Sequence, residues 1–299
     1  MRVILTGSNG FIGGYVSSYL RSKGCEVIGV DLGDEAKKQV DSYIKCDLKT
    51  EATGELIKKT GKVDAIVHLA SDMRHEPYGV EIVGNNCVGV QRLIELCEAE
   101  KVPVFVQLSS LPVIGTPIEH PITEEHPLRP PTVYHVTKCT QELLANYAYY
   151  TFGQRTVSFR ICAPVGVGVN PKTIFSVFVK NAVNGDDIVL YGKGTRKQTY
   201  IHVLDIAQAI YKAIISKAHG VYNLASNNLI SNKDLAEMII KETGSSSKIV
   251  FSGNPDPLDG VIWDISIEKA KRDMGYEPEI GLKQPIRELA DVFRKEAGR

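Results

Sequence analysis

Two short stretches of the sequence hold residues that could carry out chemistry. Tyr134-His135-Val136-Thr137-Lys138 places a tyrosine and a lysine four positions apart, so both side chains would lie on one face of a helix. Thr6-Gly7-Ser8-Asn9-Gly10-Phe11-Ile12-Gly13 holds three glycines whose backbone could approach a dinucleotide pyrophosphate closely. Each stretch alone is a weak signal. Together, and in this order, they indicate redox chemistry on an alcohol carbon.

The tyrosine–lysine pair predicts proton transfer. A free tyrosine has a pKa of about 10 and is a poor base at neutral pH. We expect the Lys138 cation and a bound oxidised nicotinamide to lower the pKa of Tyr134. The phenolate could then take a hydroxyl proton while hydride leaves the same carbon for NAD. Lys138 could also hold the nicotinamide ribose, and the alternative for Tyr134 is a half-buried aromatic residue. Ser109 and Ser110 end a predicted strand, where a hydroxyl could donate to a substrate oxygen; the alternative, above all for Ser109, is a strand-end cap.

The glycine stretch lies between a predicted strand and a predicted helix, whose positive end would face a pyrophosphate; an ordinary glycine turn is the alternative. Asp31 ends the second predicted strand, where a carboxylate accepts hydrogen bonds from ribose hydroxyls and repels a 2′-phosphate, which favours NAD over NADP. A solvated turn aspartate is the alternative there. Asp47 and Leu48 close the third strand, where an adenine ring could rest, although Asp47 could instead be a helix N-cap.

These stretches need a sheet edge to bring them together, and the apolar pattern predicts one. Predicted strands cover residues 2–6, 26–30, 42–46, 63–69, 102–108 and 156–160, and predicted helices cover 11–23, 51–60, 80–100 and 134–152. This alternation predicts an α/β fold, a Rossmann-type doubly wound parallel sheet. The proline-rich loop 109–133 would be functional.

The pattern becomes irregular after residue 160, with short strands near 188–191, 199–203 and 221–224 and helices near 174–184, 204–216, 231–242, 267–274 and 282–295. We therefore predict an NAD-binding domain of residues 1–165 and a smaller, mainly substrate-binding region of residues 166–299. The strand and helix near 199–217 would rejoin the first domain.

Composition narrows the class of protein. The chain of 299 residues has 35 acidic and 35 basic side chains and no formal net charge, so nucleic acid is not an expected partner. No apolar run approaches the ~20 residues of a membrane span. Six cysteines show no metal spacing, so we expect no metal and a reducing, cytoplasmic location. The first residues are predicted to form a strand and not a secretion signal.

Further motifs surround these stretches. His68-Leu69-Ala70, Asn86 with Gly89, and Ser109-Ser110 with Val113 and Gly115 occur in order between the glycine stretch and Tyr134. Together these features resemble the extended short-chain dehydrogenase/reductase family, in its NAD-dependent epimerase/dehydratase group. The resemblance extends to the second half, at residues 160–164, 192–205 and 264–276, which are similar to segments of nucleotide-sugar enzymes.

The resemblance implies roles for individual residues. It implies a catalytic triad of Ser110, Tyr134 and Lys138, a small-molecule substrate, and a homodimer formed through the helices at 80–100 and 134–152. It implies NAD contacts from Gly7, Asn9, Gly10, Phe11, Ile12, Asp31, Asp47, Leu48, Leu69, Ala70, Ser71, Asn86, Tyr134 and Lys138.

The substrate end departs from the family pattern. UDP-sugar epimerases usually have Asn where Ala163 stands and Arg, which grips a diphosphate, where Gln198 stands. A further arginine has no clear counterpart in residues 254–261. Arg196 or Lys197 could replace this charge from a shifted position, or both could be solvated loop charges. The predicted substrate-binding residues are thus Ser110, Ala163, Arg196 and Gln198.

The residues after Ser110 bear on the reaction. Dehydratases of this family carry an acid pair there, whereas this chain has Leu111 and Pro112, neither of which can move a proton. The resulting hypothesis is an NAD-dependent nucleotide-sugar epimerase, acting at C4 by hydride transfer to and from bound NAD. The alternative is an NAD-dependent sugar dehydrogenase or keto-sugar reductase. A third hypothesis is a non-catalytic dinucleotide sensor, against which the intact triad argues.

Overall fold

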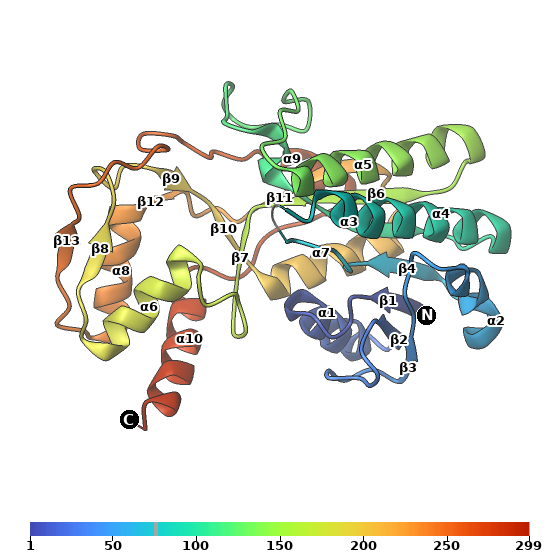
Figure 1. Ribbon diagram of the computed structural model, residues 1–299, viewed down its shortest axis with the longest axis horizontal. Helices are drawn as coiled ribbons and strands as arrows, with labels where there is room; N and C mark the ends of the chain where they lie inside the picture. The colour runs from blue at the N-terminus through green and yellow to red at the C-terminus, as the bar shows by residue number, and fades with distance from the viewer. Residues whose placement is uncertain (75–76, 299) are drawn as a thin grey trace.

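A seven-stranded parallel sheet is the centre of the larger part of the molecule (Figure 1). The structure is a computed structural model, and it describes residues 1–74 and 77–298. The strand order is β11-β6-β5-β4-β1-β2-β3. These strands are β1 (Arg2–Thr6), β2 (Glu26–Asp31), β3 (Ser42–Lys45), β4 (Ala65–His68), β5 (Phe105–Ser110), β6 (Thr156–Ile161) and β11 (Gly220–Leu224). The order reverses between β1 and β4, which is where doubly wound sheets bind ligands. The predicted fold class is confirmed.

Helices cover both faces of this sheet (Figure 1). One face carries α1 (Phe11–Ser22) and α7 (Val203–Ile215), and the other carries α3 (Gly79–Val83), η2 (Gly84–Val88), α4 (Gly89–Glu100) and α5 (Val133–Phe152). Strand β1 shows why its three central residues are apolar. Val3 and Leu5 pack in the core beneath α1 and α7, and Ile4 packs in the core on the opposite side, because successive side chains of a strand point to opposite faces.

Three predicted elements differ in detail from those observed. The helix predicted at 80–100 contains a π-helical turn, η2, between α3 and α4; such turns insert one extra residue and occur often at functional sites. The strand predicted at 102–108 instead runs from Phe105 to Ser110. Val102 donates its amide to the Cys97 carbonyl at 2.9 Å, beyond a left-handed Lys101, so this segment closes α4 before the strand begins. The segment at 51–60 divides into η1 (Glu51–Glu55) and α2 (Leu56–Thr60).

A second body with its own core lies beside the carboxyl edge of the sheet (Figure 1). Its core is formed by α6 (Ile174–Asn184), α8 (Asn232–Thr243) and α10 (Lys283–Glu296), with β8 (Ile188–Leu190) paired to β13 (Ile249–Phe251). Two more short pairs are β7 (Ala163–Val165) with β10 (Tyr200–His202), and β9 (Lys197–Gln198) with β12 (Ile230–Ser231). Strands this short carry no periodicity, and β7, β9, β12 and β13 were not predicted.

The remaining elements return the chain to the sheet. α7 packs against α1, β11 completes the sheet, and α9 (Glu268–Met274) packs against β11. The division into a domain of 1–165 and a region of 166–299, with 199–217 rejoining the first domain, remains a prediction. Among the described residues, no helix combines the length and apolarity required to cross a membrane.

Candidate active site

A cavity of about 1450 Å³ lies along the carboxyl ends of β1, β2, β4, β5 and β6, and the second body forms its other wall. Single small-ligand pockets are typically about 300–1,000 Å³, so this cavity has room for a dinucleotide and a substrate together. Every residue predicted above to act in catalysis or to bind cofactor or substrate lines it. The structure thus brings the predicted set together from both halves of the chain.

The glycine turn forms a cradle that side chains would fill. Gly7 has φ +70°, and a Cβ there would lie 2.6 Å from the Ala70 amide nitrogen. A Cβ on Gly13 would lie 2.2 Å from the Gly7 carbonyl oxygen. Gly10 is the N-cap of α1 and provides no side-chain cap, which leaves the first amide groups of this helix available to a ligand. These residues fit a dinucleotide pyrophosphate.

Asp31 is held at the end of β2 by two backbone amides. Its Oδ2 accepts from the Asn9 amide at 2.9 Å, and its Oδ1 accepts from the Leu32 amide at 2.8 Å. The Asn9 side chain donates to the Glu35 carbonyl at 3.1 Å and accepts from the Lys37 amide at 2.7 Å. Asn9 therefore fixes the loop after β2 beside Asp31, the carboxylate that is predicted to bind the ribose hydroxyls.

Asp47 has a local structural role as well as a place on the cavity wall. Its Oδ1 accepts from the Lys49 amide at 3.0 Å, which stabilises the turn after β3. The N-cap residue of the following η1 is Thr50, so Asp47 is not a helix N-cap. Its predicted role beside the adenine remains open to a ligand test.

Cofactor preference follows from Asp31. Asp31→Asn should weaken NAD binding about tenfold, because a charge-assisted hydrogen bond to ribose becomes a neutral one. NADP should bind better than to the wild type, because the carboxylate no longer repels the 2′-phosphate. Titration of both cofactors, followed by protein fluorescence, measures the ratio. Asp34→Asn is the matched control, since Asp34 is exposed and paired with Lys45. An unchanged ratio in Asp31→Asn would contradict the ribose role.

Tyr134 and Lys138 project from the first turns of α5. The helix starts after Thr132, whose hydroxyl accepts from the His135 amide at 3.4 Å. Lys138 Nζ donates to the Leu108 carbonyl at 2.8 Å and to Gln141 Oε1 at 3.1 Å, and it lies 5.7 Å from the centroid of the Tyr134 ring. The lysine is therefore anchored to the end of β5, beside the phenol ring.

In the protein without ligands, the pKa of Tyr134 is raised and not lowered, so the expected direction is wrong for this state. Burial raises the pKa of Tyr134 to about 12, and a hydrogen bond with the Ser71 side chain opposes the rise. Lys138 does not lower the pKa of the phenol in this arrangement. Burial also lowers the pKa of Lys138 to about 8, with Glu142 opposing. Desolvation dominates the pKa shift of Tyr134, and the hydrogen bonds of the Lys138 ammonium go to Leu108 and Gln141.

The two serines at the end of β5 have different surroundings. Ser109 Oγ donates to Glu142 Oε1 at 2.5 Å, and Glu142 forms a buried ion pair with Arg160 at 2.8 Å. Ser109 is therefore a structural residue. Ser110 precedes the short helix η3 (Leu111–Ile114), makes no side-chain cap bond to it, and lines the cavity. Both serines line the cavity, but Ser109 is engaged with Glu142, so Ser110 is the one placed to meet a substrate.

Asn86 connects the cavity wall to α5. Its side chain lies in the π-helical turn η2, accepts from the Asp72 amide at 2.7 Å and donates to Thr137 Oγ1 at 2.9 Å. The Gln141 side chain donates to the Asn86 backbone carbonyl at 2.9 Å. Asn86 thus holds the segment after β4, which includes Ser71, against α5. The sequence motif located this residue, but it did not indicate the π turn.

The burial of His68, at the end of β4, predicts that part of the free energy of unfolding is lost in acid. Burial lowers the pKa of His68 from 6.5 to about 3, so between these pH values the unfolded chain binds a proton that the folded protein does not. The stability from neutral His68 is complete above pH 6.5 and is lost as the pH falls toward 3. Between pH 6.5 and 5 the loss is about 2 kcal/mol.

Urea unfolding at pH 6.5 and pH 5 measures this component. The free energy of unfolding of the wild type should fall by about 2 kcal/mol more than that of His68→Gln, which has no titrating imidazole. The comparison within each variant removes any constant effect of the substitution. Equal losses in the two proteins would show that His68 does not titrate as its burial requires.

The substrate end of the cavity is formed by β7, β9 and the segment that ends at Ile265. Arg196 and Gln198 line the cavity, whereas the exposed Lys197 does not, because alternate residues of an extended segment share a face. Gln198 Nε2 donates to the Tyr200 hydroxyl and lies 3.5 Å from Asn232 Oδ1. Trp263 also lines this end. Sequence analysis missed Trp263, since only its pairing with β9 brings it there.

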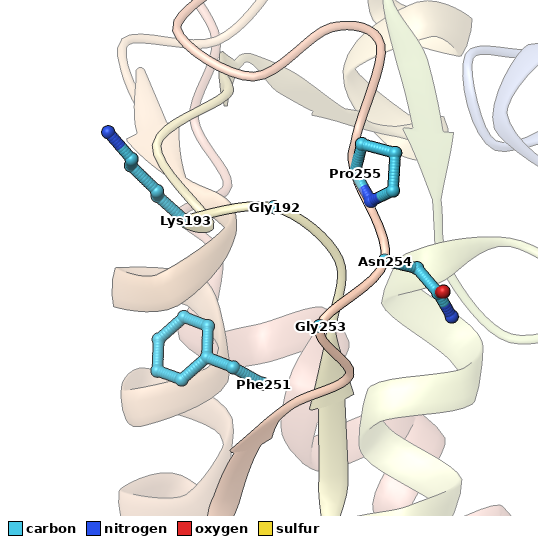
Figure 2. A pocket seen from close by; sticks show the side chains of 6 residues that line it. All are labelled: Gly192, Lys193, Phe251, Gly253, Asn254 and Pro255. Carbon is cyan, nitrogen blue, oxygen red and sulfur yellow. The ribbon is translucent and has the colours of Figure 1, made fainter.

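A second cavity of about 500 Å³ lies in the second body, where Gly192 and Asn254 pair their backbones (Figure 2). Figure 2 shows the side chains of Lys193 and Asn254 pointing away from each other. None of the predicted site residues lines this cavity. The chemistry therefore belongs to the larger cavity.

Comparison with known proteins agrees with this geometry. A model of the NAD dependent epimerase/dehydratase family matches residues 3–225. The chain belongs to this family. The predicted family and the expected enzyme class are confirmed, and NAD is the family's cofactor.

Curated relatives in the family are named for different reactions. The chain is 26% identical over 312 residues to a dTDP-glucose 4,6-dehydratase of Streptomyces niveus, covering 98% of this chain and 93% of that protein. It is 25% identical over 312 residues to an uncharacterized UDP-glucose epimerase of Bacillus subtilis, covering 96% of each.

Solved structures share the whole fold. A UDP-glucose 4-epimerase of Thermotoga maritima with UDP-glucose matches with a TM-score of 0.89 at 21% identity, covering 99% of this chain and 100% of that one. A UDP-glucose 4-epimerase of Thermus thermophilus in complex with NAD matches with a TM-score of 0.83 at 24% identity, covering 98% and 99%. At these identities the likeness shows the fold, and the substrate has to be argued from this chain's own residues.

Proposed function

We propose that this family member is an NAD-dependent 4-epimerase of a nucleotide sugar. The observation that carries the proposal is one cavity, lined by the glycine turn, by Ser110, Tyr134 and Lys138, and by a substrate wall from the second body. Its volume suits two ligands. Solved relatives with this fold hold UDP-glucose or NAD, which supports the ligand class.

Within this proposal the cofactor is held by the glycine turn, the start of α1 and Asp31. Bound NAD would accept and return a hydride and, when oxidised, add a positive charge to the cavity. Tyr134 would exchange a proton with a sugar hydroxyl, and Ser110 would donate a hydrogen bond to the same oxygen. Lys138, fixed by Leu108 and Gln141, would supply the protein's own positive charge near the phenol.

Epimerisation is favoured over dehydration by the residues beside Ser110. Leu111 is buried and Pro112 lines the cavity, and neither side chain can donate or accept a proton. Elimination of water from a sugar needs a proton donor for the leaving hydroxyl. The likeness to dehydratases therefore supports the family and not that reaction.

An assay with a panel of nucleotide sugars tests the proposal. The protein with NAD should convert at least one of them to its C4 stereoisomer without net formation of NADH. Net NADH formation with no stereoisomer would select a sugar dehydrogenase instead, with keto-sugar reduction as its reverse. Loss of water would show that another group replaces the missing acid pair. No inversion of any nucleotide sugar would contradict the proposal.

The same proposal includes a homodimer in the cytoplasm. On α5, Leu143, Tyr147 and the 82% exposed Tyr150 lie on one helix face, and Val80 on the neighbouring α3 is 86% exposed. An apolar surface of this kind is typical of a protein interface. Sedimentation equilibrium should give twice the mass of one chain, and a monomer would contradict the pairing. All six cysteines are free thiols, which supports a reducing compartment.

A further inference from the structure

We propose that Arg196 Nε and Trp263 Nε1 together bind the phosphate oxygens of the substrate's nucleoside diphosphate, in place of the arginine that Gln198 replaces. This inference rests on the proposed function, because it names how that substrate would be held. Its starting point is that both nitrogens are buried donors without a hydrogen-bond partner among the described residues. Both residues line the larger cavity.

Unpartnered buried donors need an acceptor. A buried N–H group without one costs about 1–3 kcal/mol, and more when the group is charged, so such groups are rare in folded proteins. The guanidinium Nε and the indole Nε1 can donate and cannot accept. A ligand that offers several acceptor oxygens would satisfy both. A diphosphate offers such oxygens together with negative charge.

The backbone holds the segments that carry Arg196 and Trp263 side by side. The Lys197 amide donates to the Val261 carbonyl at 2.9 Å, and the Trp263 amide donates to the Lys197 carbonyl at 2.9 Å. Thr199 Oγ1 donates to the Trp263 carbonyl at 3.0 Å. The Arg196 carbonyl accepts from the Asn232 amide at 3.0 Å. Strand β9 and the segment 261–263 therefore form one rigid support for Arg196 and Trp263.

Charge complementarity also favours an anion. Among the described lining residues that follow Ile161, Arg196 carries the single charge, and the others are apolar or neutral polar. The acidic residues of the cavity, Asp31, Asp47 and Asp72, come from the first half of the chain. An anionic ligand at the wall formed by the second body would thus meet a cation without a competing carboxylate.

Neighbouring residues do not compete for this role. Gln198 is engaged with the Tyr200 hydroxyl and with Asn232, so it positions Tyr200. The Arg196 charge opposes the burial that raises the pKa of Tyr200, which places the guanidinium near that hydroxyl. Lys197 lies on the opposite face and is exposed. Of the two candidates for the missing arginine charge, Arg196 is therefore the one that faces the cavity, and Lys197 is not.

Calorimetric titration of the NAD-saturated protein with UDP, dTDP, GDP and ADP, and with the matching nucleosides, tests the inference. The wild type should bind at least one of these diphosphates. Arg196→Gln should lower the affinity for that diphosphate about 10- to 100-fold, because a charge-assisted hydrogen bond is lost, and should leave the affinity for its nucleoside unchanged. Trp263→Phe keeps an aromatic ring but removes the indole N–H donor, and it should lower the affinity for the same diphosphate about fivefold. Lys197→Gln is the matched control and should bind as the wild type does.

The outcomes separate this inference from the proposed function. Equal diphosphate affinity of Arg196→Gln and the wild type would overturn the inference and leave the epimerase proposal standing. Equal losses in Arg196→Gln and Lys197→Gln would also overturn it, because they would indicate a diffuse charge effect. A wild type that binds no nucleoside diphosphate would overturn both. In the turnover assay, Arg196→Gln should raise KM and leave kcat unchanged.

Discussion

Replacing Tyr134 by phenylalanine should lower kcat for epimerisation by about 10²–10⁴-fold and weaken NAD binding by no more than about tenfold, because the cofactor loses one hydrogen bond of many. The phenol is the one group in the proposed mechanism that exchanges the substrate proton. Its hydroxyl hydrogen-bonds with the Ser71 side chain, so the substitution removes little from the fold. Single-turnover kinetics with the substrate found in the panel assay, together with NAD titration, measures both quantities.

The raised pKa makes this prediction sharper. With a pKa of about 12, about one phenol in 10⁵ is ionised at pH 7, so Tyr134 in the protein alone is an acid and not a base. Activity therefore requires positive charge to be assembled at the phenol when the ligands bind. Tyr191→Phe, at an exposed tyrosine outside the cavity and outside the proposed dimer surface, is the matched control and should keep wild-type kcat. An unchanged kcat in Tyr134→Phe would assign proton transfer elsewhere and revive the sensor hypothesis.

The sequence predicted the site better at its cofactor end than at its substrate end. The glycine turn, Asp31, Tyr134 and Lys138 lie on long elements with strong periodicity, and strands of a parallel sheet deliver their carboxyl ends to one edge. That rule alone places these residues together. Trp263 could not be found in this way, because it reaches the cavity through a two-residue strand, β9, that has no period to detect.

Electrostatic detail was also beyond the sequence. The spacing of Tyr134 and Lys138 predicted one helix face, but it could not show that Lys138 Nζ donates to the Leu108 carbonyl. That contact comes from packing α5 against β5. It engages the ammonium in a hydrogen bond to the end of β5, and burial decides the pKa of Tyr134. Likewise, the different surroundings of Ser109 and Ser110 depend on the buried Glu142, which lies 33 residues from Ser109 along the chain.

Gly7→Ala should weaken NAD binding by about 100-fold or more and destabilise the fold. At φ +70° an alanine is strained by about 1–2 kcal/mol, and its Cβ would also lie 2.6 Å from the Ala70 amide nitrogen and 2.8 Å from the Leu69 carbonyl carbon. Both neighbours are backbone atoms and cannot rotate away. The turn must therefore shift, which moves the start of α1 and the pyrophosphate contacts that depend on it, each worth about 1.5–3 kcal/mol.

Gly24→Ala separates these two causes. Gly24 has φ +77°, and a Cβ there would meet nothing within 4 Å, so this variant bears the backbone strain without the collision. Both variants should lose about 1–2 kcal/mol of unfolding free energy from strain, but only Gly7→Ala should lose NAD affinity. Urea unfolding and NAD titration of both variants decide the matter. If the two variants bound NAD equally well, the turn at Gly7 would not hold the dinucleotide, and the close approach of β1 to the β4 end would be a packing feature alone.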